Sequence, residues 1–248
     1  MIGRAGMRDM VFLHGGGQGG WVWEETIAAV GRQSGGAVRC LALDAPGCGA
    51  KRGVDNAAYA FADTTRELIG DILASGLRGV MLVGHSQAGM TIPHMADLAP
   101  GGLIGKLAYV TCSAPLPGLT TLDQMGRGPR GSSVEEVGYP SGSEAERYAT
   151  MFCNDMEEGE AAAFLGKLGH DGWPASAYAY SEWRYDHLRA IPACYVVALR
   201  DMALPASWQE RFADRLHARR LHRIDAGHQV MNTRPEALAE VLLAEARS

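Results

Sequence analysis

The stretch from Val80 to Gly89 constrains the fold of this chain most strongly. It begins with the apolar run Val-Met-Leu-Val, which is typical of a buried strand, and it passes through Gly-His-Ser into a segment expected to be helical. Such a sharp turn lifts one side chain off the end of a sheet and places it at a helix N-terminus, where free backbone N–H groups favour negative charge. The pattern predicts a nucleophile elbow with Ser86 at its tip. Ala88 stands where glycine is usual, and an ordinary turn whose serine caps the helix is the alternative interpretation.

Apolar segments alternate with helical segments along most of the chain. The expected strands are residues 10–13, 39–43, 80–83, 107–111, 193–199 and 221–224. The expected helices are residues 23–30, 59–73, 87–98, 206–216 and 235–246, with further helices between residues 144 and 168. Strands that alternate with helices imply a parallel sheet with helices on both faces. The predicted fold class is therefore α/β, with a mostly parallel six-stranded sheet flanked by helices.

The alternation is interrupted between residues 114 and 186, where Gly, Pro, Ser and charged residues are frequent and aromatic residues cluster near the end. A chain of 248 residues suits one large domain with an insertion. We therefore expect residues 1–113 and 187–248 to form the core domain. Residues 114–186 are expected to form a helical cap insertion that covers the functional site.

A glycine-rich loop follows the first expected strand. Residues 14–20, called the glycine loop below, read His-Gly-Gly-Gly-Gln-Gly-Gly. Glycines free the backbone to turn sharply and can leave N–H groups directed into a cleft, so the loop is predicted to supply an oxyanion hole. A phosphate-binding loop is the alternative, but no Gly-Lys-Ser/Thr sequence follows, and no acidic ribose-binding residue lies in a convincing register.

Two later strands end in residues that could activate Ser86. A serine hydroxyl needs a general base to become a nucleophile, and catalytic groups of parallel sheets lie on loops after the strand carboxyl ends. Asp201 follows the fifth expected strand and His228 follows the sixth, which predicts a Ser-His-Asp triad in which His228 is the base and Asp201 orients it. Asp225 is a rival acid, ranked lower because it lies so close to His228 in the sequence.

Composition limits the partners that we expect. The net charge is -5 and no basic run is present, so nucleic acid is not an expected partner. No apolar run reaches the length of a membrane span or a signal-peptide core, which predicts a cytoplasmic protein without membrane association. The five cysteines are scattered and odd in number, and they predict neither a disulfide framework nor a metal site.

Several motifs occur together in this one chain. They are His14-Gly15-Gly16 with Gly20-Trp21, Gly84-His85-Ser86, Met151-Phe152-Cys153-Asn154-Asp155, Asp201 with Ala203-Leu204-Pro205, and Gly227-His228. Together they resemble the α/β-hydrolase superfamily, specifically the branch that holds plant methylesterases and hydroxynitrile lyases. The similarity covers nearly the whole chain, and the insertion is its most divergent part. The resemblance implies an α/β-hydrolase fold with a cap and a serine nucleophile.

Three positions favour an esterase over a lyase within that branch. The esterases carry His where this chain has His85 and Gly where it has Gly15, whereas the lyases have Glu and a hydroxyl residue. The lyases also need Lys directly after the catalytic His, and here that residue is Gln229. The resemblance further implies that the N–H groups of Gly16 and Gln87 form the oxyanion hole. It implies no metal or organic cofactor, and it is compatible with a homodimer.

The predicted function is hydrolysis of a carboxylic ester of a small or medium apolar substrate through an acyl-enzyme, and a methyl ester is one candidate. The alternatives are a carbon–carbon bond hydrolase or hydroxynitrile lyase-like enzyme on the same triad, and a non-enzymatic small-molecule receptor. The candidates to line an apolar substrate pocket are Gly15, Met125, Trp173, Tyr178 and Trp183. Packing of the insertion against the core is the alternative role of the larger side chains.

Overall fold

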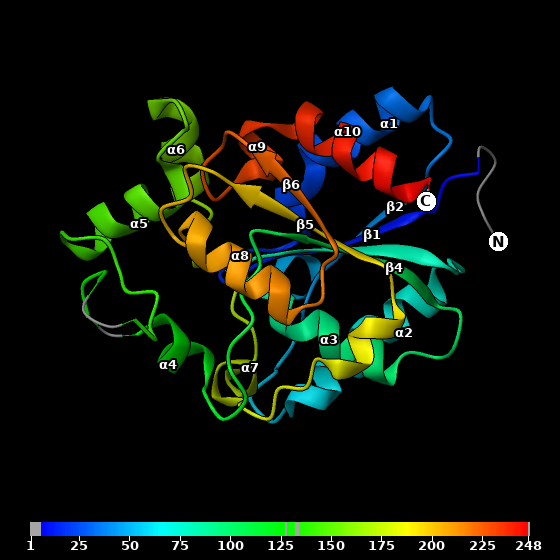
Figure 1. Cartoon of the computed structure of the whole chain (residues 1–248), viewed down its shortest axis with the longest axis horizontal. Helices are drawn as coiled ribbons and strands as arrows, with labels where there is room; N and C mark the ends of the chain where they lie inside the picture. The colour runs from blue at the N-terminus through cyan, green and yellow to red at the C-terminus, as the bar shows by residue number, and fades with distance from the viewer. Residues whose placement is uncertain (1–5, 127, 132–133, 248) are drawn as a thin grey trace.

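A six-stranded, wholly parallel sheet forms the centre of the molecule (Figure 1). The computed structural model describes residues 6–126, 128–131 and 134–247. The strands are β1 (Met10–Leu13), β2 (Cys40–Leu43), β3 (Val80–His85), β4 (Ile104–Val110), β5 (Ala193–Ala198) and β6 (Arg220–Ile224), in the spatial order β2-β1-β3-β4-β5-β6. The predicted fold class is confirmed, and each strand begins and ends within three residues of its expected bounds.

Both faces of the sheet are covered by helices, because alternate strand residues point to opposite sides and most of them are apolar. Met10 and Phe12 contribute to one core cluster, whereas Val11 and Leu13 contribute to the other. The helices over the first face are α1 (Glu24–Ser34), α9 (Val230–Thr233) and α10 (Pro235–Ala246). The helices over the second face are α2 (Phe61–Ala74), α3 (Ala88–Leu98) and α8 (Ala206–Arg215). None of the helices in the described part of the chain is long and apolar enough to cross a membrane.

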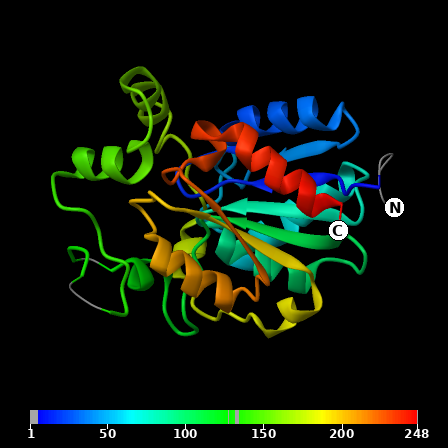
Figure 2. The ribbon, with the colours of Figure 1, turned by 45° about the horizontal axis from the view of Figure 1, so that its top comes forward.

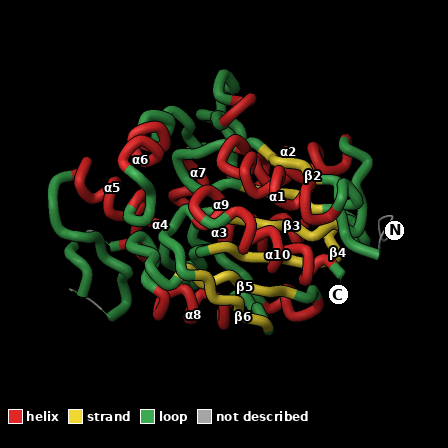
Figure 3. The backbone as a smooth tube through the Cα atoms, turned by 90° about the horizontal axis from the view of Figure 1, so that it is seen from above, coloured by secondary structure: helices red, strands yellow, loops and turns green. Residues whose placement is uncertain are grey.

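The chain between β4 and β5 adds no strand to the sheet. It contains α4 (Thr121–Met125), α5 (Glu144–Cys153), α6 (Glu158–Leu165), α7 (Ala175–Ala179) and the 3-10 helix η3 (Asp186–Ala190). In Figure 2 the strand arrows point towards the side on which the green helices α5 and α6 lie, and Figure 3 shows these two helices beyond the same end of the sheet. Two further 3-10 helices, η1 (Gly20–Trp23) and η2 (Gly49–Lys51), follow β1 and β2. The helices α5 and α6 of the expected insertion therefore lie at the carboxyl edge of the sheet, where we expect catalytic groups.

Candidate active site

Ser86 lies at the tip of a tight turn between β3 and α3. Its φ angle of 51° is in the left-handed region, where a residue other than glycine is strained. Two glycines give the turn its space. A Cβ on Gly84 would lie 2.3 Å from Ile92 Cδ1, and one on Gly89 would lie 2.4 Å from the Ser113 carbonyl oxygen. The close approach of strand and helix therefore depends on these two positions, and Ala88 is accommodated between them.

The structure brings Ser86, His228 and Asp201 into one chain of hydrogen bonds. His228 Nε2 lies 3.0 Å from Ser86 Oγ, and His228 Nδ1 lies 2.7 Å from Asp201 Oδ2. The side chains of His228 and Asp201 are almost fully buried, at 1% and 0% exposed. With Nδ1–H donated to the carboxylate, Nε2 is free to accept the Ser86 proton. The arrangement can therefore turn the Ser86 hydroxyl into a nucleophile.

Asp201 is held by the loop that follows β5. Its Oδ1 accepts hydrogen bonds from the backbone N–H groups of Ala203 and Leu204, at 2.7 and 2.8 Å. The Gln209 side chain in α8 donates to Oδ2 over 3.2 Å and also contacts the backbone of Ala198 and Leu204. The rival acid Asp225 is 74% exposed and pairs with Arg200 at the surface.

His228 is held by residues on both sides of its loop. The backbone N–H of Gly227 donates to Asp155 Oδ2 over 2.8 Å, which connects the loop after β6 to the segment after α5. The ring of Phe152 lies 5.6 Å from the His228 ring. The Met151–Asp155 motif therefore contacts the loop that carries His228.

His85 supports His228 from the interior. Its Nε2 lies 3.1 Å from the His228 carbonyl oxygen, and the two rings are 4.6 Å apart. Burial, followed by the neighbouring His228, lowers the pKa of His85 well below 6.5. His85 is therefore neutral at pH 7 and donates its Nε2–H to the carbonyl oxygen of His228.

Gly16 and Gln87 present their backbone N–H groups without an internal acceptor in the described part of the chain. Gln87 is the first residue after Ser86 and the N-cap of α3. A Cβ on Gly16 would lie 2.5 Å from Gln87 Oε1, and a Cβ on Gly15 would lie 3.0 Å from Ser86 Cβ. The glycine loop thus lies directly over the turn that carries Ser86, and a side chain on Gly15 would crowd His85 and Ser86.

The four large side chains expected in the pocket divide into two groups. Trp173 donates its indole N–H to the Gly15 carbonyl oxygen over 3.1 Å, and Tyr178 lies against Gln87 and Gly16. Trp183 instead packs on Phe61 and Tyr180, while Met125 packs against the core cluster on the same face of the sheet. The contacts of Trp173 and Tyr178 place them beside the glycine loop, whereas those recorded for Trp183 and Met125 involve no residue of the hydrogen-bonded chain.

Three residues that contact the site were not predicted from the sequence to be site residues. His14 hydrogen-bonds Gly15, Gln209 hydrogen-bonds Asp201, and Asp155 accepts from Gly227. The position of His14 at the start of the glycine loop could have pointed to it. Asp155 belongs to one of the motifs that carry the family resemblance, which could have pointed to it as well. No sequence pattern points to Gln209, because its contact depends on the angle between α8 and β5.

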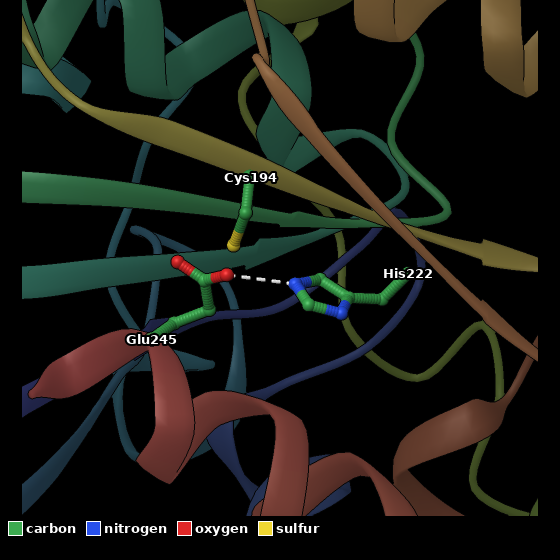
Figure 4. Close-up of side chains that lie close together, drawn as sticks. All are labelled: Cys194, His222 and Glu245. Atoms are coloured by element: carbon green, nitrogen blue, oxygen red, sulfur yellow. Dashed lines mark hydrogen bonds and ion pairs between the residues drawn. The ribbon is translucent and has the colours of Figure 1, made fainter. Parts of the chain in front are cut away.

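A second cluster of chemically versatile side chains lies between β5, β6 and α10 (Figure 4). The ligand-type atoms of Cys194, His222 and Glu245 lie within 4.8 Å of one another. Glu245 Oε1 is 2.7 Å from His222 Nε2, while Oε2 is 2.6 Å from the charged groups of both Lys106 and Arg220. Burial raises the pKa of Cys194 to about 12, so the thiol keeps its proton. Two neighbouring cations and a protonated thiol favour a buried ion-pair network over a metal site.

Comparison with known proteins assigns the fold to a family. Residues 10–241 match the model of a family described as alpha/beta hydrolase. The chain is 26% identical over 255 residues to "Putative methylesterase 11, chloroplastic" of Arabidopsis thaliana, which covers 96% of this chain and 63% of that relative. It is 34% identical over 110 residues to "Carbendazim hydrolyzing esterase" of a Nocardioides strain, covering 44% of this chain and 43% of that relative.

Solved structures show the same architecture. An extracellular alpha/beta-hydrolase from a Paenibacillus species superposes with a TM-score of 0.75 at 21% identity, covering 96% of this chain and 98% of that one. At this identity the similarity establishes the fold alone. The chain spans 63% and 43% of the lengths of the two curated relatives, so the match to each of them is partial.

Proposed function

This chain belongs to the alpha/beta hydrolase family, and we propose that it is a serine hydrolase that cleaves a carboxylic ester of a small or medium apolar substrate through an acyl-enzyme. The observation that carries the proposal is the hydrogen-bonded chain from Ser86 Oγ through His228 to Asp201. The relatives described as esterases support ester hydrolysis in general. A methyl ester is one candidate substrate, since one of those relatives is described as a methylesterase.

Acylation begins when Ser86 Oγ attacks the ester carbonyl carbon and His228 Nε2 takes the hydroxyl proton. Asp201 stabilises the positive charge that develops on the imidazole. The carbonyl oxygen becomes an oxyanion, which accepts hydrogen bonds from the N–H groups of Gly16 and Gln87; losing one such donor typically costs about 2.7–4 kcal/mol of barrier. When the tetrahedral intermediate collapses, His228 gives its proton to the leaving alcohol and Ser86 remains acylated.

Deacylation repeats the steps with water as the nucleophile. His228 removes a proton from the water as it attacks the acyl carbon, and the same two N–H groups stabilise the second oxyanion. Collapse releases the carboxylic acid and returns the proton to Ser86. All proton transfers use one imidazole atom, Nε2, which is the atom that lies 3.0 Å from Ser86 Oγ.

The residue after His228 argues against cyanide release as the main reaction. A departing cyanide needs a nearby cation to stabilise its charge, and Gln229 offers only a neutral carboxamide, which is fully buried. His85 is likewise neutral at the bottom of the site, because burial lowers its pKa. Ester cleavage needs no cation at either position, because the alcohol leaves with the proton of His228.

Replacement of Ser86 by Ala tests the proposal. We expect the hydrolysis of p-nitrophenyl acetate and butyrate to fall by about 10⁴–10⁶-fold, because the attacking oxygen is gone and the rest of the triad has nothing to activate. Ser207→Ala, which changes an exposed serine of α8, is the matched control and should retain wild-type rates. A fluorophosphonate should label the wild type on the peptide that contains Ser86, and it should not label the variant.

Each alternative function has its own outcome in this experiment. Turnover that is equal in wild type and Ser86→Ala contradicts the nucleophile assignment. Release of cyanide from mandelonitrile that exceeds ester turnover contradicts the choice of reaction. Labelling of Ser86 without turnover of any short ester favours a receptor over an enzyme.

A further inference from the structure

The carbonyl oxygen of Gly15 accepts two side-chain hydrogen bonds. His14 Nδ1 lies 2.8 Å from it, and the indole N–H of Trp173 donates to it over 3.1 Å. The ring of Trp173 meets the His14 ring edge-on, with centroids 5.3 Å apart. Two aromatic side chains, one at the start of the glycine loop and one from the chain between β4 and β5, thus hold a single peptide oxygen.

The protonation state of His14 makes it the donor of the hydrogen bond to the Gly15 carbonyl oxygen. The backbone N–H of Ala45 donates to His14 Nε2 over 3.2 Å, so this nitrogen must carry a lone pair. Burial lowers the pKa of His14, and the ring is therefore neutral with its one proton on Nδ1. His14 and Trp173 consequently both donate to the Gly15 carbonyl oxygen, which fills its two lone pairs.

Holding this oxygen also sets the direction of the next N–H group. In a trans peptide the C=O of one residue and the N–H of the next lie in one plane and point in opposite directions, and the described chain has no cis peptide. The N–H of Gly16 therefore points away from His14 and Trp173. Gly15 itself lies against Ser86, since a Cβ there would be 3.0 Å from Ser86 Cβ. The orientation of this peptide decides whether Gly16 offers a donor to the oxyanion.

The three consecutive glycines of the loop cannot keep that orientation by themselves. Gly15, Gly16 and Gly17 carry no side chains that could hold the backbone, and Gly17 has a φ angle of 68° that only glycine adopts readily. Rotation of the peptide between Gly15 and Gly16 would direct a carbonyl oxygen, instead of an N–H, at the reacting carbonyl. Such a change would remove one donor and add repulsion for the developing charge.

Trp173 is itself held firmly by the segment that leads into it. Residues 169–173, called the return segment below, run along the glycine loop and the loop after β2. Gly169 N–H donates to the Gly17 carbonyl oxygen over 3.1 Å, and Gly172 N–H donates to the Gly47 carbonyl oxygen over the same distance. The Trp173 side chain is 4% exposed. Its indole therefore has a defined position relative to the glycine loop.

We propose that Trp173 is a positioning residue for the oxyanion hole: its indole N–H fixes the Gly15–Gly16 peptide so that the Gly16 N–H faces the reacting carbonyl, and it thereby couples the chain between β4 and β5 to the chemistry at Ser86. The proposal rests on the proposed ester hydrolysis. It assigns Trp173 a hydrogen bond as its main contribution, in place of an apolar wall of the substrate pocket. Its effect belongs to the transition state, because the oxyanion forms only there.

Trp173→Phe removes the N–H and keeps an aromatic ring. For p-nitrophenyl acetate we expect kcat to fall about 10- to 100-fold and KM to change less than about 3-fold; loss of a whole oxyanion donor costs about 10²–10³-fold, and His14 still holds the peptide in this variant. Tyr185→Phe is the matched control, because it deletes a buried O–H that donates to the Pro115 carbonyl oxygen over 2.8 Å. We expect its kcat to remain within about 3-fold of the wild-type value.

An inhibitor that forms an oxyanion supplies a second measurement. A trifluoromethyl ketone adds to a serine nucleophile as a hemiketal anion, so Trp173→Phe should weaken its binding by the same factor as kcat/KM. Incorporation of β-(3-benzothienyl)alanine at position 173 preserves the shape of the ring system without the N–H. This protein should reproduce the Phe variant if the hydrogen bond is what matters, and it serves as the test if the Phe variant fails to fold.

The outcomes separate the two proposals. If the wild type shows no Ser86-dependent ester turnover, the proposed function fails before Trp173 is in question. If wild type and Ser86→Ala behave as expected but the benzothienylalanine protein keeps wild-type kcat and inhibitor affinity, the positioning role is wrong. A loss that appears in KM alone also contradicts it, because that result assigns Trp173 to the substrate pocket.

Discussion

At the scale of single residues, the two carboxylate oxygens of Asp201 bind different partners. Oδ1 accepts two backbone N–H groups, from Ala203 and Leu204, which fixes the plane of the carboxylate. Oδ2 faces His228 Nδ1. Asparagine has the same shape but only one oxygen, and its NH₂ group is a donor. It therefore cannot accept both from the backbone N–H groups and from His228 Nδ1. The orientation of the imidazole therefore depends on the charge of residue 201 and not on its size.

Asp201→Asn should reverse the tautomer of His228. The amide oxygen remains with Ala203 and Leu204, the NH₂ group donates to His228 Nδ1, and the proton moves to Nε2, which can no longer accept from Ser86. We expect kcat for p-nitrophenyl esters to fall about 10⁴-fold. Asp225→Asn alters the exposed rival acid and should keep wild-type activity. Equal losses in the two variants would contradict the assignment of Asp201.

At the scale of elements, the return segment is bound to the loops after β1 and β2. Asp171, whose side chain is fully buried, accepts from the backbone N–H of Gly49 at 2.8 Å, from Arg52 Nε at 2.9 Å and from the indole N–H of Trp21 at 3.0 Å. Burial alone would raise the pKa of Asp171, but these hydrogen bonds outweigh it and hold the pKa below its usual value. The carboxylate therefore connects the loops after β1 and β2 to the end of the chain between β4 and β5.

Asp171→Asn should lower the free energy of unfolding by about 1–3 kcal/mol, since its NH₂ group must face at least one of the three donors and leave it unsatisfied. Equilibrium unfolding in urea measures this difference. The matched control is Asp186→Asn, at a side chain that is 96% exposed and pairs with Arg189, where we expect little change. A variant at position 171 that is as stable as the control would show that the cluster adds nothing to the fold.

Most of the strands were predictable because they are short apolar runs that end at a turn, whereas β6 holds two arginines and a histidine. Ser86, Asp201 and His228 were predicted as site residues because each lies just after the carboxyl end of an expected strand. The helices α4 and α7 were not predicted, because each has only five residues and begins after Thr120 or Pro174 within a segment rich in turn-forming residues. The Trp173 hydrogen bond was not predictable either. It joins residues 158 positions apart, and no local pattern marks the partner of an indole N–H.

At the scale of the whole molecule, two buried neutral histidines make stability depend on pH. Burial lowers the pKa of both His14 and His85, and that of His85 falls well below 6.5. Below about pH 6.5 the unfolded chain binds protons at these positions that the folded protein does not bind, so stability is fully present above that pH and is lost as the pH falls through this range. The free energy of unfolding therefore decreases as the pH falls below about 6.5.

Lowering the pH from 7.5 to 5.5 should reduce the free energy of unfolding by up to about 1.4 kcal/mol for His85, with a further contribution from His14. Urea unfolding at the two pH values measures the decrease. His85→Asn should show a smaller decrease than the wild type, whereas His170→Asn, at an exposed position, should show the same decrease. An unchanged pH dependence in His85→Asn would indicate that other groups cause the acid sensitivity.

The return segment also sets where a stretch of this chain can be exchanged with a homologue. The helices α4, α5 and α6 contribute no strand to the sheet, so their residues can differ in a homologue without a change in the order of the strands. Residues 169–173 lie within the expected insertion, residues 114–186. Their hydrogen bonds nevertheless join them to the glycine loop and to the loop after β2. A chimaera whose exchanged stretch ends before Gly169 would keep the hydrogen bonds of the return segment to the glycine loop, whereas one whose exchanged stretch ends after Trp173 would replace them.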